Sequence, residues 1–570
     1  MACVVAPPPE LARDIVWRDE MPRTFDALAQ DMGLLSDSQA QALRARAQYL
    51  RMDDAAIDLG WLTEAQVDAV VSEQSFDVYV NAPQAAHPAF LGWLRALAAQ
   101  GVIARVHKVS AQTLAQVREQ GGEVRRADGV SAQAIDETAL QQATELFMDC
   151  AAVGGQDLHV EIRPTHTEIK LRVKSELRQI ANLSLHADQG EALIRAIVAG
   201  VATVKPPTYN PRDFQDAQIA GGALPGSGLS SVRIIRGPAW PVEEGGGFLV
   251  ARLQYGTRRA VDPERARAAA KRLGLTKIAP IAGEFQLGQM GYTAHQVQLI
   301  ERILARPMGI TFVSGPTGSG KTTTLYEMAL RLARLCPGER LITIENPVEY
   351  PIAHAIQLEA AGAEFSHRLR MTLRMDPDTL LPSEIRGFDE AIAALHAALS
   401  GHRVLTTIHV TDPFETILRL ELFDAVNLSR HMICHPNIVA GLISQRKVAV
   451  LCKHCRAPLS SIVLPAYQRE ALSTWGRLDA MYVRGAGCEH CDGEAIAGEE
   501  AVAEVVVTDE QLMRECRELG PAEAAKRHRA REGADKTMIE HAMDRVLSGR
   551  YDPRDVAKAV AEIPTREPRV

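Results

Sequence analysis

The stretch VSGPTGSGKTTTLYEMAL, residues 313–330, decides the fold of the central part of this chain. An apolar run, ITFV, leads into it, and a pattern typical of a helix follows. Residues 315–322 match GxxxxGK(S/T) without a gap, in the strand–loop–helix context that this phosphate-binding loop requires. We therefore predict that nucleotide is bound by Gly315, Pro316, Thr317, Gly318, Ser319, Gly320, Lys321, Thr322 and Thr323.

Each residue type in this loop has a physical reason. Glycines let successive backbone N–H groups point at phosphate oxygens, and Lys321 supplies positive charge to the β- and γ-phosphates. The hydroxyl of Thr322 is placed to ligate Mg²⁺. The loop alone does not identify the work done, because kinases, helicases, transporters and switches all use it.

Size and composition narrow the class of protein. A chain of 570 residues exceeds one hydrophobic core, so we expect three or four domains. Its net charge of −8 gives no chain-wide attraction to nucleic acid or to an anionic membrane. The N-terminal residues lack the pattern of a signal peptide, and no apolar run is long enough to span a membrane. We expect a cytoplasmic protein.

The pattern of apolar residues changes along the chain. Residues 1–75 read as helical, with Ser36 and Thr63 as helix N-caps, and the next stretch is mixed. Residues 139–255 read as an α+β domain, and an α/β alternation follows to residue 451. The tail after Cys491 reads as helical and charged. We predict the segments 1–135 (N-terminal), 136–260 (α+β), 261–286 (linker), 287–450 (nucleotide-binding), 451–500 (cysteine-rich) and 501–570 (helical).

Three stretches beyond the phosphate loop carry a resemblance to a known family. They are ITIENPVEYPI (342–352), LRMDPDTLLPSEIRGFDEAIAALHAALSGH (373–402) and VLTTIHVTDPFETILRL (404–420). Their order and spacing resemble the cytoplasmic hexameric ATPases of type II secretion and type IV pilus assembly. The resemblance implies a multidomain α/β protein whose RecA-like P-loop ATPase core follows a PAS-like α+β domain. It also implies ATP and Mg²⁺ as ligands.

The resemblance assigns roles to individual residues. Glu345 matches the acidic box, Glu384 the Walker B acid and His409 the histidine box, and either glutamate would position the attacking water. Arg233 and Arg252 match arginines that the family sends toward the nucleotide, where a guanidinium neutralises charge on the γ-phosphoryl group. The other arginines considered for this role are Arg236 and Arg172.

Two departures from the family pattern concern the acids. The family has two adjacent acids where this chain has Glu345 followed by Asn346, so one negative charge is missing. The residues before Glu384 are Pro382 and Ser383, and proline removes a backbone donor from the strand. We expect these changes to affect turnover more than nucleotide binding.

Four of the nine cysteines form two CxxC pairs, Cys452/Cys455 and Cys488/Cys491, separated by 32 residues. Each pair places two sulfurs on one tight turn, and two such turns form the tetrahedral S₄ set that favours Zn²⁺. We predict a structural zinc site. His454 and His490 lie inside the pairs as substitute ligands. By resemblance, this element favours an assembly or secretion motor over a retraction motor.

The resemblance also implies partners: a homo-hexamer docked on an inner-membrane platform protein of a pilus, conjugative pilus or secretion machine. Residues 58–74 resemble the helical region through which such motors dock, and related versions bind a cyclic dinucleotide. Membrane association would then be peripheral, through the partner.

Two alternatives stay open. The first is a nucleic-acid motor or helicase with the cysteine pairs as a DNA-binding ribbon. The acidic net charge and the few aromatic residues near the cysteines, Tyr467, Trp475 and Tyr482, disfavour stable nucleic-acid binding. The second is a nucleotide-binding regulatory subunit with little turnover, which Asn346 and Pro382 keep open.

Overall fold

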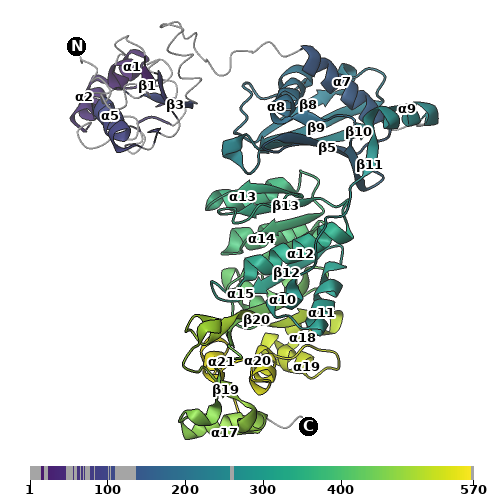
Figure 1. Ribbon diagram of the computed structural model, residues 1–570. Coiled ribbons are helices and arrows are strands. Elements are labelled where there is room, and N and C mark those ends of the chain that lie inside the picture. The colour runs from purple at the N-terminus through teal and green to yellow at the C-terminus, as the bar shows by residue number, and fades with distance from the viewer. Residues whose placement is uncertain are drawn as a thin grey trace. The chain divides into compact units, whose positions relative to one another are not determined.

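The computed structural model of this chain describes residues 15–17, 24–46, parts of 56–109, 137–256 and 262–566 (Figure 1). The chain separates into two compact units, Met1–Gln133 and Ala134–Val570. Each unit is described by itself.

The N-terminal unit is mixed α/β. The sequence predicted helices over residues 1–75, where β1 is instead a strand. In the mixed stretch after it, strands predicted over 78–83 and 101–110 are present as β2 and β3, and a helix predicted over 88–100 is present as α5. Its three-stranded sheet has the order β1-β2-β3, with β1 antiparallel and β3 parallel to β2. Ser36 caps α2 as predicted, because Gln39 N donates to Ser36 Oγ at 3.4 Å and Ser36 N donates to Gln39 Oε1 at 2.9 Å. Thr63 makes the same reciprocal bonds with Gln66. A helix predicted over residues 111–120 lies outside the described residues. The elements are β1 (Ile15–Trp17), α1 (Phe25–Asp31), α2 (Asp37–Arg46), β2 (Asp77–Asn81), α5 (Pro88–Ala99) and β3 (Arg105–Val109).

The second unit begins with an antiparallel sheet domain. Its main path has the order β11-β6-β5-β4-β10-β9-β8, and β7 pairs with β5. The sequence predicts strands over residues 156–164, 168–175, 230–237 and 247–255, and all four are present, as β4, β5, β9 and β10. The bounds are α7 (Glu137–Ala152), β4 (Asp157–Ile162), β5 (His166–Val173), β6 (Glu176–Ile180), β7 (Leu185–His186), α8 (Ala187–Arg195), β8 (Gln215–Ala220), β9 (Leu229–Pro238), β10 (Gly247–Tyr255), α9 (Pro263–Leu273) and β11 (Leu275–Lys277).

This sheet is buried on both faces in its middle. Side chains alternate between the faces of a strand, so neighbouring residues enter different cores. Ile234 and Leu249 pack in a core with residues of α7 and α8, while Ile235 and Phe248 join the core of the following nucleotide-binding domain. The two domains of this unit therefore share one continuous apolar contact. The predicted PAS likeness of this sheet stays a prediction.

The nucleotide-binding domain is built on a seven-stranded sheet of order β14-β13-β15-β16-β12-β17-β20. The first six strands pair in parallel, and β20 is antiparallel to β17. The sequence predicts buried strands over residues 308–315, 340–345 and 402–409, and they are present as β12, β13 and β16. The bounds are β12 (Gly309–Ser314), β13 (Leu341–Glu345), β14 (Ala355–Glu359), β15 (Thr379–Pro382), β16 (Arg403–Ile408), β17 (Val439–Leu451) and β20 (Ile496–Val507).

Helices cover both faces of this sheet. Residues of α11 and α12 pack on one face, and residues of α13, α14, α15 and α18 pack on the other (Figure 1). Parallel strands covered on both faces require near-continuous apolar sequences, and β12, β13 and β16 are buried throughout. The helices are α10 (Leu287–Met290), α11 (Ala294–Leu304), α12 (Lys321–Leu335), α13 (Ala363–Thr372), α14 (Phe388–Leu399), α15 (Glu415–Phe423) and α16 (Arg430–Ile433).

The tail after Cys491 is not all helical, which corrects the sequence prediction. Its first element, β20, is a 12-residue strand that completes the core sheet, and the predicted boundary between residues 500 and 501 falls inside it. The sequence of this strand lacks the alternation of apolar and polar residues that predicts a strand, because Ala501–Val506 is buried on both faces. Short strands β18 (Ala457–Pro458) and β19 (Tyr482–Val483) and helix α17 (Ala466–Trp475) lie between β17 and β20 in the chain. The final helices are α18 (Glu510–Leu519), α19 (Pro521–Arg529), α20 (Met538–Leu547) and α21 (Pro553–Ala559).

A buried charge cluster joins the antiparallel sheet to the nucleotide-binding domain. Arg172 Nε lies 2.5 Å from Asp376 Oδ2, and its NH2 lies 2.7 Å from Asp378 Oδ2. His159 Nε2 lies 3.1 Å from Asp376 Oδ2, and Arg340 contacts His159 and Glu161. Burial lowers the pKa of Arg340 to about 10. Charges buried in this way need their partners, so the cluster specifies how the two domains meet.

Replacing Arg172 should destabilise this unit strongly. Arg172→Met buries no charge of its own but leaves two partly buried carboxylates without their main counter-charge, and we expect it to lower the free energy of unfolding by about 3 kcal/mol in urea denaturation. Arg178→Met on the adjoining strand is the control, since its pair with Glu176 is exposed and worth below about 1 kcal/mol. Equal effects of the two substitutions would contradict the structural role given to the cluster.

Candidate nucleotide-binding site

The predicted phosphate loop connects β12 to α12. Gly315, Gly318 and Gly320 have φ values of +146°, +79° and +84°, which side chains with a Cβ rarely adopt. A Cβ on Gly315 would also lie 2.4 Å from the Gln445 carbonyl oxygen. The loop can therefore take this path only with glycine at these positions, and its N–H groups together with the first turn of α12 form an anion-binding concavity.

Hydrogen bonds of Gln445, a residue of β17, hold the loop in place. Gln445 Nε2 donates to the Ser319 carbonyl at 2.6 Å, and Gln445 Oε1 accepts from Tyr292 OH at 2.7 Å and Thr324 Oγ1 at 2.9 Å. Burial raises the pKa of Tyr292, so its hydroxyl stays a donor. Lys321 Nζ donates to the carbonyl oxygens of Gly315 and Pro316, each at 3.0 Å. These contacts preform the loop without any ligand.

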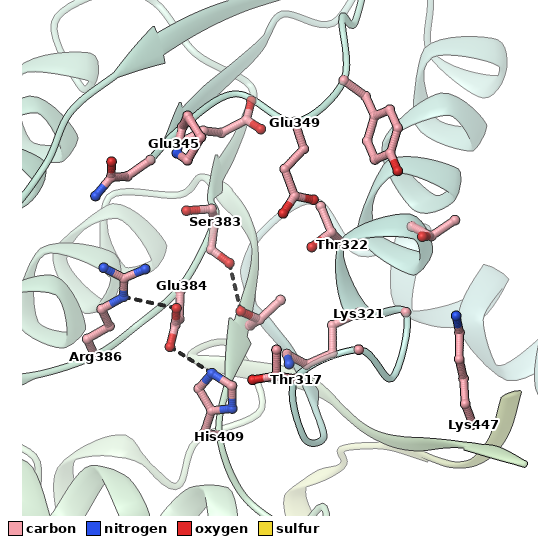
Figure 2. A pocket seen from close by; sticks show the side chains of 17 residues that line it. Thr317, Lys321, Thr322, Glu345, Glu349, Ser383, Glu384, Arg386, His409 and Lys447 are labelled. Atoms are coloured by element: carbon pink, nitrogen blue, oxygen red, sulfur yellow. Dashed lines mark hydrogen bonds and ion pairs between the residues drawn. The ribbon is translucent and has the colours of Figure 1, made fainter.

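A cavity of about 370 Å³ opens beside the loop (Figure 2). The carboxyl ends of parallel strands β13, β15 and β16 all contribute to its wall, which is where this fold class places its ligands. Both predicted acids and the predicted histidine line the same cavity as the loop. The side chains and backbone that line it belong to Thr317, Gly318, Gly320, Lys321, Thr322, Thr323, Glu345, Asn346, Pro347, Glu349, Tyr350, Ser383, Glu384, Arg386, Thr407, His409 and Lys447.

Glu384 is partly open to the cavity. Arg386 Nε donates to its Oε2 at 2.9 Å, and His409 Nε2 lies 3.0 Å from its Oε1 (Figure 2). Thr407 Oγ1 donates to the Ser383 carbonyl at 2.7 Å, which fixes the turn just before the acid. Pro382 ends β15 without disturbing the sheet, since Ser383 N makes the next bond, to the Ile344 carbonyl, at 2.9 Å. The carboxylate of Glu384 therefore has a fixed orientation and access to water.

Glu345 is buried and accepts three hydrogen bonds. Thr343 Oγ1 donates to its Oε1 at 2.5 Å, Gln357 Nε2 donates to the same oxygen at 2.9 Å, and Tyr326 OH donates to Oε2. Burial raises the pKa of Tyr326, and the hydrogen bond and charge of Glu345 raise it further. This carboxylate has little remaining capacity to hold a reacting water.

Lys321 faces the acids. Burial lowers the pKa of its ammonium group, while the charge of Glu384 acts in the opposite direction. Two charged residues of the cavity, Glu349 and Lys447, were missed by the sequence reasoning. The sequence could have indicated Glu349, since it follows Glu345 by four residues in the same loop. It gave no indication of Lys447, because this residue comes from a strand far along the chain.

The predicted arginines do not meet the phosphate loop. Arg233 and Arg252 are cross-strand partners that line a separate cavity of about 310 Å³ with Leu373 and Arg374. Arg252 Nε donates to Asp157 Oδ1 at 2.8 Å. Arg236 is buried and donates to backbone carbonyls of residues 210 and 213, and Arg172 belongs to the charge cluster. All four arginines lie on strands of the antiparallel sheet, away from the loop.

The four predicted zinc ligands converge. The Sγ atoms of Cys452, Cys455, Cys488 and Cys491 lie within 4.8 Å of one another, and three of the pairs are separated by 3.7 to 3.8 Å. A tetrahedron of sulfurs at about 2.3 Å from zinc has edges of about 3.8 Å, so the residues fit Zn²⁺. His454 and His490 lie side by side with their rings tilted by 30° and the ring centroids 3.9 Å apart, and they are not among the four converging ligands.

Comparison with known proteins gives the family. Residues 266–558, about half of the chain, match the family described as "Type II/IV secretion system protein". The chain belongs to this family. The matched part contains the phosphate loop, both acids, the histidine and the four cysteines.

Three relatives similar to this chain are named as proteins of type IV pilus assembly or type II secretion. The chain is 28% identical over 421 residues to the type IV pilus assembly ATPase PilB of Thermus thermophilus, covering 73% of this chain and 42% of that protein. It is 27% identical over 415 residues to the type II secretion system protein HxcR of Pseudomonas aeruginosa, covering 72% and 75%. It is 29% identical over 290 residues to the type II secretion system ATPase E of Vibrio cholerae, covering 49% and 54%. The match thus spans about half the length of most of these family members.

Solved structures of pilus and secretion ATPases are also similar. The chain is 18% identical to the pilus retraction motor PilT with bound ADP, covering 73% of this chain and 96% of that one at a TM-score of 0.36. Among the described residues of this type II/IV secretion protein, no helix has the length and apolarity needed to span a bilayer.

Removing a cysteine from the tetracysteine cluster should abolish metal binding. We expect elemental analysis of the purified protein to find one zinc per chain and Cys488→Ser to lose it, because three thiolates no longer close the tetrahedral site. Cys336→Ser, which changes a cysteine outside the cluster, should keep the zinc. Zinc retained by Cys488→Ser, or absent from the unaltered protein, would refute the site.

Proposed function

We propose that this chain is an ATPase that powers the assembly of a type IV pilus, a conjugative thin pilus included, or of a type II secretion pseudopilus. The observation that carries this proposal is the single cavity that brings the phosphate loop, Glu345, Glu384 and His409 together. The names of the relatives, which are pilus assembly and secretion ATPases, point to the same activity.

The loop's N–H groups and Lys321 would hold the triphosphate, and Thr322 would ligate Mg²⁺. Bound Mg²⁺ supplies charge neutralisation at the β- and γ-phosphates. Glu384 is the better of the two acids for orienting the attacking water, because it is partly exposed in the cavity and held by Arg386 and His409. Glu345 instead shapes the wall, since its oxygens already accept bonds from Thr343, Gln357 and Tyr326.

Arg233 and Arg252 remain our proposal for neutralising phosphate charge, under one condition. They lie in their own cavity, so they would reach a nucleotide only after the domains move or from a neighbouring copy of the chain. Closure of domains around a nucleotide would convert hydrolysis into motion.

The proposed machine is a cytoplasmic homo-hexamer docked on an inner-membrane platform protein. The antiparallel sheet domain (predicted at 136–260), to which α9 and β11 of the predicted linker (261–286) add a helix and the edge strand, would transmit motion from the nucleotide-binding domain (287–450). The tetracysteine element, predicted at 451–500, would be a zinc-stabilised insertion between β17 and β20, followed by the C-terminal helices. Residues 1–135 would form the docking region.

Phosphate release from the purified protein tests the activity. We expect Lys321→Ala to remove turnover and Glu384→Gln to lower kcat by about 100- to 1000-fold, since the amide cannot accept the proton of water. Glu345→Gln should reduce kcat by about tenfold or less, through altered packing.

Turnover of the unaltered protein no higher than that of Lys321→Ala would overturn the ATPase and favour the regulatory subunit. Stimulation by DNA, but not by the platform protein with anionic lipid, would favour the nucleic-acid motor. A larger loss in Glu345→Gln than in Glu384→Gln would exchange the roles of the two acids.

A further inference from the structure

A second lysine stands at the edge of the nucleotide cavity. Lys447 comes from β17 and lines the cavity near Gly320 and Thr323, whereas the acids enter from β13 and the end of β15. Gln445 and Lys447 are two residues apart on one strand, so their side chains leave it on the same face. On this face Gln445 donates a hydrogen bond to the Ser319 carbonyl of the loop, and the side chain of Lys447 lies beside Gly320.

The stem of Lys447 lies against the loop itself. A Cβ placed on Gly320 would lie 3.7 Å from Lys447 Cε and 3.4 Å from Gln445 Nε2. Figure 2 shows Lys447 on the other side of the loop from Glu384 and His409. In the same view Lys321 lies between Lys447 and the side chains of Glu384 and His409. The two lysines therefore flank the loop.

The ammonium of Lys447 is only weakly engaged. Its one ion pair among the described residues is with Glu499, at 3.6 Å, and the two side chains are 44% and 60% exposed. An exposed pair of this kind contributes little free energy, so the lysine can leave it for a stronger anion. The strand β17 fixes the backbone of Lys447 near the loop, while the exposed ammonium group can change its partner.

The place of Lys447 determines which part of a nucleotide it meets. Lys321 and Thr322 face the β- and γ-phosphates, and the acids on their side mark the reacting end. The α-phosphate and the nucleoside must then extend along the opposite side of the loop, toward Lys447. We infer that Lys447 binds the α-phosphate of the nucleotide. This inference rests on the proposed function, since it takes a nucleotide to be the ligand of the loop.

A contact at the α-phosphate has a distinctive kinetic consequence. The α-phosphate does not change charge during hydrolysis, so the contact is equally strong in the ground state and the transition state. Loss of Lys447 should therefore raise KM and the Kd of ADP together and leave kcat nearly unchanged. Loss of Lys321, which faces the transferred phosphoryl group, should instead remove turnover.

The test compares Lys447→Ala with Lys447→Arg, using calorimetric titration with Mg·ADP and steady-state phosphate release from ATP. We expect Lys447→Ala to raise both the Kd of ADP and the KM of ATP by about five- to tenfold, with kcat within twofold. Lys447→Arg should restore most of the affinity. Glu499→Gln, which releases the lysine, should leave KM at or below that of the unaltered protein. Lys277→Ala, an exposed lysine of β11, is the matched control.

A Kd and KM for Lys447→Ala within twofold of the Lys277→Ala control would overturn the inference, and so would a loss of kcat at constant KM. Failure of the proposed activity is a separate outcome. It would appear as absent turnover in the unaltered protein, while ADP titration of the Lys447 variants still decides whether this lysine binds nucleotide.

Discussion

The hydrogen bonds of Gln445 support the whole nucleotide site. Three glycines with positive φ give the phosphate loop its shape, and such a loop is costly in conformational entropy unless its backbone is tied down. Gln445 supplies the tie by donating to the Ser319 carbonyl, and its own oxygen is satisfied by Tyr292 and Thr324. Because all of these groups are buried and paired, the network specifies one loop conformation.

The two cavity glutamates show how the surroundings separate the roles of like residues. Glu345 is almost fully buried and accepts hydrogen bonds from three donors, whereas Glu384 is more exposed and has a guanidinium and an imidazole beside it. The absence of a second acid at Asn346 is partly offset by Glu349, which brings a carboxylate to the same cavity from the loop after β13. Proline at position 382 is tolerated because it ends its strand.

The arrangement of the antiparallel sheet and the nucleotide-binding domain depends on the charged contact between them. Asp376 receives Arg172 and His159 from the sheet, and the residues around it lie just before β15, at the opposite end from the cavity. Burial raises the pKa of the neighbouring Asp157, and the charge of Asp376 adds to this effect. Polar clusters of this kind hold a domain arrangement through matched partners.

The sequence by itself determined the features whose chemistry is local along the chain. The phosphate loop, the buried strands β12, β13 and β16, the helix cap at Ser36 and the CxxC pairs each depend on residues within a few positions, so their patterns could be read directly. Glu345 and Glu384 were also predicted, since acids that end parallel strands meet at one edge of a sheet. Only the tertiary structure decided the placement of Arg233 and Arg252, the saturation of Glu345, the strand β20 and the presence of Lys447 in the cavity. These depend on strand order and domain packing, because contacts between distant segments form only when the whole chain buries its apolar surface and pairs its charges.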